Sequence, residues 1–475
     1  MFFLKLKNFK IIFLNIFCIF FLIYFSILAS RQLTSTVINI DSDYASLYHI
    51  FNQNKNFYDV FYTAQVISIH TENKVTKVSI APKITPHINL NTPSMSLFVK
   101  FMVNLSNKTS INTTVWILTD LFCAAVSLAV LMQWIDSLSS KACYFFPLLL
   151  SLWLSWPNIY NLNQGEVALF LLPLLSIAFV ADDAKKYNTA CILLALLASL
   201  KLFFLIFVFL YIARRQWRLF FIFCLSFLLF FLLSRLYFSW ADYLSYFQLL
   251  QNHALIIQRA IASMNGSILG VIANIVRLSG LSIPVDKVFI ISGVLTLYVF
   301  IRWFIFDYRH MNKLTEFRDA IRFSFLIVLA LLCSPLGWLY YYLFLLVPIA
   351  VIFNVSQKYA LSKTLFIFFT LALILPLFCF FDLSDKSIVL QIIRALVLFS
   401  SLLCWLVCLR LLVYTILDKK PVIVYHRTLL LALIFAYSSL SFIVFSSDVR
   451  MNYMLQWNKT NYFKTVAPDI WVNKI

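Results

Sequence analysis

The chain has 475 residues, of which 62% are hydrophobic and only 12% are charged; its mean hydropathy is +0.90 and its formal net charge is +19. Soluble domains carry about 25% charged residues, so these figures exclude a soluble enzyme, a disordered chain and a disulfide-stabilised scaffold. Apolar segments of about twenty residues recur along the chain and indicate a polytopic membrane protein, whose basic loops explain the positive charge without a nucleic-acid partner.

The first apolar segment covers residues 11–29 and follows three lysines, Lys5, Lys7 and Lys10. It is long for a signal peptide, and no small-x-small cleavage site precedes Arg31. We therefore expect a retained first transmembrane helix with its N-terminus in the cytoplasm. The polar stretch that follows, residues 31–110, is then an outer-face segment.

Further apolar segments follow at short intervals. They lie near residues 113–134, 142–159, 166–181, 189–213, 216–238, 287–306, 320–336, 339–354, 363–381, 387–416 and 427–446. Alternate loops are basic, at Lys185/Lys186, Arg214/Arg215/Arg218, Lys313/Arg318/Arg322, Lys358/Lys363 and Lys419/Lys420/Arg427. Basic loops stay in the cytoplasm, so these loops predict the cytoplasmic face.

Residues 189–213 break this alternation, because basic clusters flank them at both ends. Lys201 also lies in the middle of the segment, where a lysine costs about 2.5–3.5 kcal/mol on membrane-insertion scales. Two helices of about twelve residues each solve both problems if they enter and leave on the cytoplasmic side, with Lys201 at the apex.

The resulting expectation is an all-α integral membrane bundle of about thirteen transmembrane helices, two of them short and near 189–213. Residues 1–446 form one polytopic domain with outer-face segments 31–110 and 239–286, and residues 447–475 form an outer-face tail. Segment 239–286 mixes aromatic and polar residues, which favours helices lying in the membrane interface.

Two carboxylates, Asp41 and Asp43, stand at the start of the first outer segment, directly before Tyr44. A carboxylate beside apolar surface has a raised pKa and can act as a general base on a hydroxyl. The alternative is structural, with Asp41 as an N-cap and Asp43 in the first turn of a helix.

Two further polar motifs precede predicted helices. In Asn91-Thr92-Pro93, the proline fits the first turn of a helix with Thr92 as its cap. In Asn163-Gln164-Gly165-Glu166, the side chains either bind a sugar or cap the next helix, where Glu166 is an ordinary first residue.

Lys201 is the strongest single candidate for a functional residue, because an ionisable group at membrane depth indicates a functional site. An anion such as a lipid phosphate is its natural partner, and a structural pair with Asp120 is the alternative. Arg235 and Arg259 are weaker candidates for the same phosphate, and Arg235 could instead extend towards the headgroups.

Two polar breaks occur later, around Asn265-Gly266-Ser267 and at Ser334-Pro335-Leu336-Gly337-Trp338, which Tyr341 closely follows. Aromatic side chains there could stack on a sugar or simply mark the membrane interface. The chain has no nucleotide-binding loop, and its six His show no metal-ligand spacing. No cofactor is expected with certainty, and a divalent metal stays an open alternative.

In this order, the motifs resemble those of glycosyltransferase family 87, polytopic bacterial enzymes of the GT-C superfold. The motifs that carry the resemblance are Asp41-Ser42-Asp43-Tyr44, Asn91-Thr92-Pro93, Asn163-Gln164-Gly165-Glu166-Val167, Leu196-Leu197-Ala198-Ser199-Leu200-Lys201, Asn265-Gly266-Ser267 and Ser334-Pro335-Leu336-Gly337-Trp338-Leu339-Tyr340-Tyr341.

The resemblance implies a polyprenyl-phosphate sugar donor, a glycan or glycolipid acceptor, and inverting transfer at the outer, periplasmic face of the cytoplasmic membrane. It implies Asp43, with Asp41 second, as the base, and Lys201 as the ligand of the lipid phosphate. The motifs also nominate a set of substrate-binding residues: Tyr44, Asn91, Asn163, Glu166, Asn265, Ser267, Trp338 and Tyr341.

Two other functions remain alternatives at this stage. A secondary transporter or a lipid or glycan flippase also has polar breaks in its spans, but usually places several ionisable groups near the membrane midplane. A polymerase or ligase of lipid-linked glycans shares the many-helix plan, but its long outer loops would lie nearer the C-terminal half.

Overall fold

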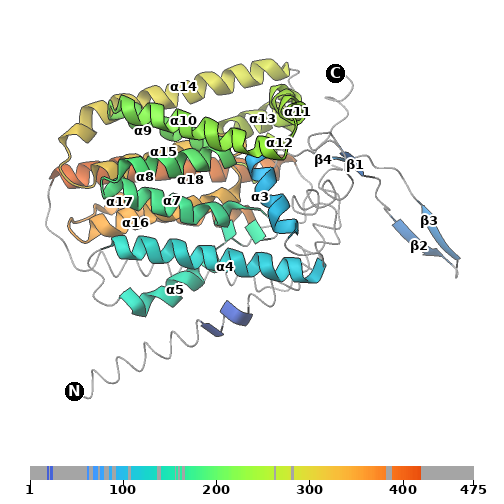
Figure 1. The fold of residues 1–475 in the computed structure, drawn as a ribbon, viewed down its shortest axis with the longest axis horizontal. Coiled ribbons are helices and arrows are strands. Elements are labelled where there is room, and N and C mark those ends of the chain that lie inside the picture. The colour runs from blue at the N-terminus through green and yellow to red at the C-terminus, as the bar shows by residue number, and fades with distance from the viewer. Residues whose placement is uncertain are drawn as a thin grey trace.

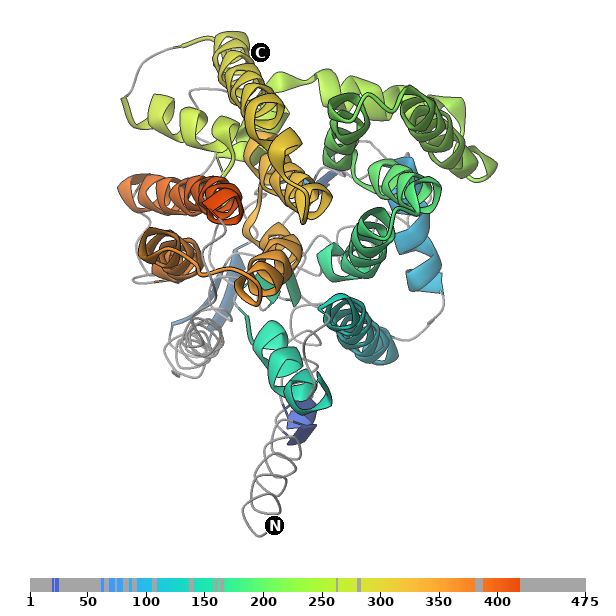
Figure 2. The same cartoon turned by 90° about the vertical axis from the view of Figure 1, so that its left-hand side faces the viewer.

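The computed structural model describes residues 19–20, 22–24, 61–63, 68–72, 75–79, 85–87, 92–104, 109–135, 141–155, 157–158, 161–162, 166–261, 264–279, 283–380 and 388–418. Within these residues the chain is a bundle of helices whose long axes run in a common direction (Figure 1). Figure 2 turns the bundle so that most of the long helices are seen end-on.

The first half of the bundle contains α3 (Pro93–Asn104), α4 (Thr109–Trp134), α5 (Lys141–Trp153), α7 (Ala168–Asp183), α8 (Tyr187–Leu200), the 3₁₀ helix η1 (Leu202–Phe207), α9 (Val208–Ala213), α10 (Trp217–Leu233) and η2 (Ser234–Leu236). The second half contains α11 (Trp240–Gln251), α12 (His253–Ala260), α13 (Ile268–Ser279), α14 (Val285–His310), η3 (Met311–Lys313), α15 (Arg318–Cys333), η4 (Leu339–Leu345), α16 (Leu346–Ser356), α17 (Lys363–Ile374), η5 (Leu375–Phe380) and α18 (Ile388–Asp418).

Four short strands, which the sequence analysis did not anticipate, lie within the first outer segment. Strand β1 (Phe61–Thr63) pairs antiparallel with β4 (Thr85–His87), and β2 (Ser68–Glu72) pairs antiparallel with β3 (Val75–Ser79). The strands stand at one end of the helical bundle in Figure 1.

Five described segments are long and apolar enough to cross a membrane. They are Ile117–Trp134, Trp217–Leu236, Val285–Lys313, Leu339–Ser356 and Gln391–Asp418. Shorter apolar helices accompany them, including both arms of the segment around Lys201. The total of about thirteen spans stays a prediction, because segments 11–29 and 427–446 lie largely or wholly outside the described residues.

The prediction of two short helices in 189–213 is confirmed. Helix α8 ends at Leu200, and Lys201 takes an extended conformation (φ −140°, ψ 114°) before η1 begins. Fourteen residues of α8 rise about 21 Å, and η1 and α9 together return over about the same length. Both ends of this hairpin meet at one end of the bundle, where Arg214 bonds Asp182 at the end of α7.

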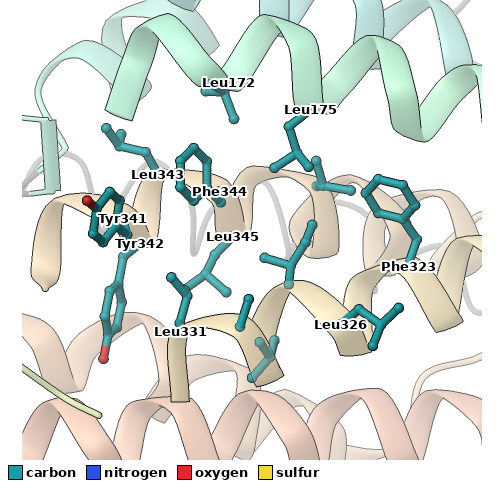
Figure 3. Close-up of a cluster of buried hydrophobic side chains, with 14 of the residues drawn as sticks. Leu172, Leu175, Phe323, Leu326, Leu331, Tyr341, Tyr342, Leu343, Phe344 and Leu345 are labelled. Carbon is teal, nitrogen blue, oxygen red and sulfur yellow. The ribbon is translucent and has the colours of Figure 1, made fainter. Parts of the chain in front are cut away.

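The core lies where α7, α15 and η4 meet (Figure 3). Every residue of α15 from Ala320 to Leu332 is buried, as is every residue of η4. Helix α10 differs, because large apolar side chains such as Phe221 and Leu225 are 66% and 70% exposed. An exposed apolar face on a helix of this length indicates contact with lipid rather than with water.

The 239–286 segment contains three helices, in keeping with the prediction of helices there. Helix α11 is seen nearly end-on in Figure 1, where the long helices lie lengthwise, so it runs across the direction of the bundle. It begins with a capping box: Ser239 Oγ accepts from the Asp242 amide, and Asp242 Oδ2 accepts from the Ser239 amide.

Candidate functional site

The hairpin apex places the Lys201 ammonium beside a carboxylate and an aromatic ring. Lys201 Nζ lies 4.0 Å from Glu166 Oε2, and both side chains are largely buried. The ammonium also lies 5.6 Å from the centroid of the Tyr341 ring, a distance at which a cation is attracted to an aromatic face. Three sequence-nominated residues therefore meet, although 35 residues or more separate each from the next along the chain.

Local chain geometry explains why Lys201 occupies this position. Thr92 caps α3, since its Oγ1 accepts from the Met95 amide at 3.1 Å, which confirms the predicted cap. The same hydroxyl donates to the Leu200 carbonyl at 2.8 Å. One threonine thus begins α3 and also satisfies a carbonyl that the end of α8 leaves without a helical partner.

Glu166 is held in place by Asn161. The Glu166 amide donates to the Asn161 carbonyl at 3.0 Å, and Asn161 Oδ1 accepts from the Ala168 amide at the start of α7. Asn161 Nδ2 donates to Asp120 Oδ2 at 3.2 Å. Asp120 therefore bonds Asn161, whereas the acidic partner of Lys201 is Glu166, and the alternative pair of Lys201 with Asp120 is wrong.

Tyr341 faces the lysine from a tightly packed aromatic group. Its ring lies 4.8 Å from Phe203, which follows the hairpin apex, and is stacked on Phe344 at 5.8 Å. Tyr341 belongs to η4 in the core, beside Phe344 (Figure 3). These contacts fix the ring that Lys201 meets. The sequence identified Tyr341 as a candidate aromatic residue, but it did not show that the Tyr341 ring faces Lys201.

Asn265 and Ser267 are buried, and their side chains join two distant segments of the chain. Asn265 Nδ2 donates to the carbonyls of Ala260 and Pro335, and its Oδ1 accepts from the Ser267 amide. Ser267 Oγ donates to Pro335 and accepts from the Gly270 amide. These polar atoms are thus occupied by the chain itself, and their predicted role in substrate binding stays a prediction.

Backbone bonds complete this junction. The Gly266 amide donates to Gly337, and the Leu339 amide donates to Met264. Trp338 stands opposite Asn265 and packs edge-on against Tyr340, with ring centroids 5.5 Å apart. The junction therefore fixes the start of η4 and, through it, the ring of Tyr341.

Arg235 lies on the exposed surface in η2. Its guanidinium donates to the Phe238 carbonyl at 3.0 Å and lies 5.2 Å from the centroid of the Trp240 ring. This placement agrees with the alternative of an arginine extended towards the headgroups, and no contact joins it to Lys201 among the described side chains. Arg259 belongs to α12, and its side chain is outside the described part.

Several nominated residues fall outside the described residues: Asp41, Asp43, Tyr44, Asn91 and Asn163. The structure therefore brings together Lys201, Glu166 and Tyr341, and leaves the positions of the two candidate bases as predictions. In the part of the chain that is described, no group of three or more His, Cys, Asp or Glu side chains is placed to hold a metal ion.

These features define a class of protein: a bundle of apolar helices, several long enough to cross a membrane, in which a helical hairpin places a lysine beside a buried carboxylate and an aromatic ring. The chain belongs to glycosyltransferase family 87, whose sequence profile matches residues 89–335, just over half of its length. The protein is therefore a glycosyltransferase. The match includes Glu166, Lys201, Asn265 and Ser267. No protein of curated function matches the chain significantly.

Proposed function

We propose that this glycosyltransferase takes its sugar from a polyprenyl-phosphate donor and that Lys201 binds the donor phosphate. The observation that carries the proposal is the ammonium of Lys201 at the apex of the hairpin, next to Glu166 and Tyr341. A phosphate is the leaving group of such a donor, and a fixed cation stabilises the negative charge that develops as the bond to the sugar breaks.

In the proposed reaction, the acceptor hydroxyl attacks the anomeric carbon of the sugar with inversion. Its proton passes to the carboxylate of Asp43, with Asp41 as the second candidate. The bond from the anomeric carbon to the phosphate oxygen breaks, and the polyprenyl phosphate leaves as an anion beside Lys201. A glycan or glycolipid carries the acceptor hydroxyl.

The depth of Lys201 supports an outer-face site. Helix α8 places the residue about 21 Å from the end of the bundle that carries the basic loops, across an apolar layer about 30 Å thick. If the basic end faces the cytoplasm, the apex lies in the outer half of the membrane. A donor phosphate in the outer leaflet of the cytoplasmic membrane can then reach it.

The alternative of a secondary transporter or flippase has less support. Membership of a glycosyltransferase family favours group transfer. In addition, Lys201 already has an acidic partner in Glu166, which suits a fixed cation that binds an anionic leaving group.

The test is transfer of labelled sugar from a polyprenyl-phosphate donor in purified membranes. Lys201→Met should lower the rate by about 10²–10³-fold, as the loss of one charge-stabilising group does in other enzymes. Asp43→Asn should lower it by about 10²–10⁴-fold, the contribution of a general base. Protein levels should stay normal in both variants.

Lys287→Met supplies the control, because Lys287 is an exposed lysine at the start of α14. It should retain normal transfer. Full activity in Lys201→Met would remove Lys201 from donor binding, and full activity in Asp43→Asn would remove Asp43 from the mechanism.

A further inference from the structure

A basic groove lies at the end of the bundle opposite the hairpin apex. It has a volume of about 640 Å³ and is formed by the loop between α7 and α8 and the loop between α9 and α10. Four cationic side chains line it: Lys185, Lys186, Arg215 and Arg218. All four are exposed, and none makes an ion pair within the described part of the chain.

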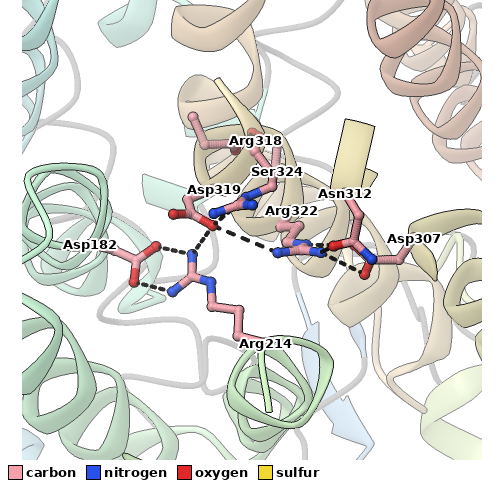
Figure 4. Close-up of polar contacts among 9 residues, drawn as sticks. Asp182, Arg214, Asp307, Asn312, Arg318, Asp319, Arg322 and Ser324 are labelled. Atoms are coloured by element: carbon pink, nitrogen blue, oxygen red, sulfur yellow. Dashed lines mark hydrogen bonds and ion pairs between the residues drawn. The ribbon is translucent and has the colours of Figure 1, made fainter. Parts of the chain in front are cut away.

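The carboxylates next to the groove offset its four cations only in part, because two of them already bond Arg214. Asp182 accepts two bonds from Arg214, at 2.6 and 2.7 Å, and Asp319 lies 3.0 Å from the same guanidinium (Figure 4). Asp183 accepts a bond from the indole nitrogen of Trp134 at 2.8 Å. That bond leaves the charge of Asp183 in place, but the four cations that line the groove outnumber it, so the groove keeps a net positive charge.

The two loops that form the groove share one backbone geometry. In each, the second residue after the helix has a left-handed conformation: Lys185 with φ 60° and Arg215 with φ 56°. The bonds from the Lys186 amide to Ala181 and from the Gln216 amide to Tyr211 complete a Schellman turn in each loop. Glycine usually occupies this left-handed position, and here both positions carry a cation.

Two helices also begin at the groove. Helix α8 starts at Tyr187 and α10 starts at Trp217, and neither N-cap side chain bonds its helix. Backbone N–H groups of the first turn therefore add to the positive potential. A phosphate has the charge and the acceptor oxygens that such a cationic groove recognises.

The surface next to the groove favours a lipid over free phosphate as the ligand. Trp217 is 56% exposed at the rim, and the exposed apolar face of α10 continues from it through Phe221 and Leu225. An exposed tryptophan above an apolar face is typical of the level at which headgroups meet acyl chains. A free phosphate would use the cations and leave this apolar face without a role.

We propose that this groove binds the phosphate headgroup of an anionic phospholipid in the leaflet at the basic end of the bundle, with an acyl chain along α10. The site is separate from Lys201 and does not depend on the proposed donor. A basic residue near an anionic membrane surface strengthens binding by about fivefold, so a pair contributes roughly twenty-fivefold.

The test compares retention of phosphatidylglycerol and phosphatidylcholine by the full-length protein in detergent, measured by native mass spectrometry. The variant is Lys185→Gly/Arg215→Gly, which removes two cations and keeps a turn that glycine favours. We expect wild-type protein to retain phosphatidylglycerol preferentially, and the double variant to lose roughly twenty-fivefold in affinity without a lower melting temperature.

The control is Arg309→Gln/Lys313→Gln, which removes two exposed cations from the same end of the bundle but outside the groove. It should bind phosphatidylglycerol within about twofold of wild type, since it leaves the groove intact. Equal retention by both double variants would overturn the proposal. Thermal protection by inorganic phosphate without retention of phosphatidylglycerol would overturn the choice of a lipid.

Discussion

Gly337 lies where the segment before η4 passes the end of α15. A β-carbon at this position would collide with the carbonyl oxygen of Leu331 and would lie 3.2 Å from Ser267 Cβ. The atom that would have to move belongs to the backbone of Leu331, which has little room to shift. The absence of a side chain at Gly337 therefore permits the junction that fixes Tyr341.

Gly337→Ala should destabilise the protein by about 1–3 kcal/mol, the usual cost of overpacking. The matched control is Gly293→Ala in α14, where a β-carbon would meet nothing within 4 Å. That change should be neutral or stabilising by up to about 1 kcal/mol, because alanine is the better helix former. Apparent melting temperatures in detergent measure both, and equal values for the two variants would contradict the prediction.

The sequence predicted the structural role of some single residues but not the contacts of others. Thr92 was predictable as a cap, because threonine before proline at a helix start is a local signal. The place of Lys201 between two short apolar helices was predictable from the residues around it. Its partner Glu166 was not, because a pair separated by 35 positions depends on how α7 packs against α8.

Among the helices, the hairpin of α8, η1 and α9 is joined to its neighbours at the basic end by the Arg214 ion pairs. Arg214 links the end of α9 to Asp182 of α7 and to Asp319 of α15, and the Asp182 side chain is only 1% exposed. Arg322 extends the network by bonding Asp307 at the end of α14 (Figure 4). Four helices are thus tied together at the basic end.

Arg214→Met should cost about 3–5 kcal/mol, because it leaves a buried carboxylate without its cation. Adding Asp182→Asn should recover part of this loss, since the uncompensated charge is then removed. A double-mutant cycle tests this, with apparent melting temperatures measured in detergent for both single variants and the double variant. Strict additivity of the two changes would show that the residues do not stabilise each other.

The exposed pair of Lys358 and Glu316, at the same end of the bundle, is the control for this cycle. Its nitrogen and oxygen lie 3.2 Å apart, but the side chains are 56% and 47% exposed. Lys358→Met should therefore cost no more than about 1 kcal/mol. A loss as large as that of Arg214→Met would contradict the distinction between buried and exposed pairs.

At the scale of these helices, the sequence predicted the hairpin because two local signals agreed: basic residues at both ends and a lysine in the middle. It did not predict strands β1 to β4, because their pattern is short and lies in a polar segment. The number of membrane spans also stays open, since helices such as α13 are apolar but short.

The whole molecule has a basic end and an opposite end that carries α11 and the start of α14. The predicted orientation can be tested on α14 alone, whose 26 residues span about 39 Å. In a variant without the native cysteines, Lys287→Cys should react with a membrane-impermeant maleimide added to cells whose outer membrane is permeabilised. Lys313→Cys, beyond the other end of α14, should react only after the cytoplasmic membrane is opened.

Labelling of Lys313→Cys in intact spheroplasts, with Lys287→Cys protected, would reverse the orientation. It would then place the Lys201 apex nearer the cytoplasm and contradict the outer-face site. Both lysines are exposed, so a difference in labelling reports the side of the membrane rather than burial in the bundle.

The sequence by itself determined the class of the protein, the helical hairpin and the place of Lys201 at its apex. These follow from hydropathy and loop charge, which act over neighbouring residues and are set by the apolar membrane. The tertiary structure alone decided that Lys201 meets Glu166 and Tyr341, that Asn265 and Ser267 bond the chain itself, and that four loop cations share one groove. These contacts join residues far apart in the chain, so the packing of helices selects them.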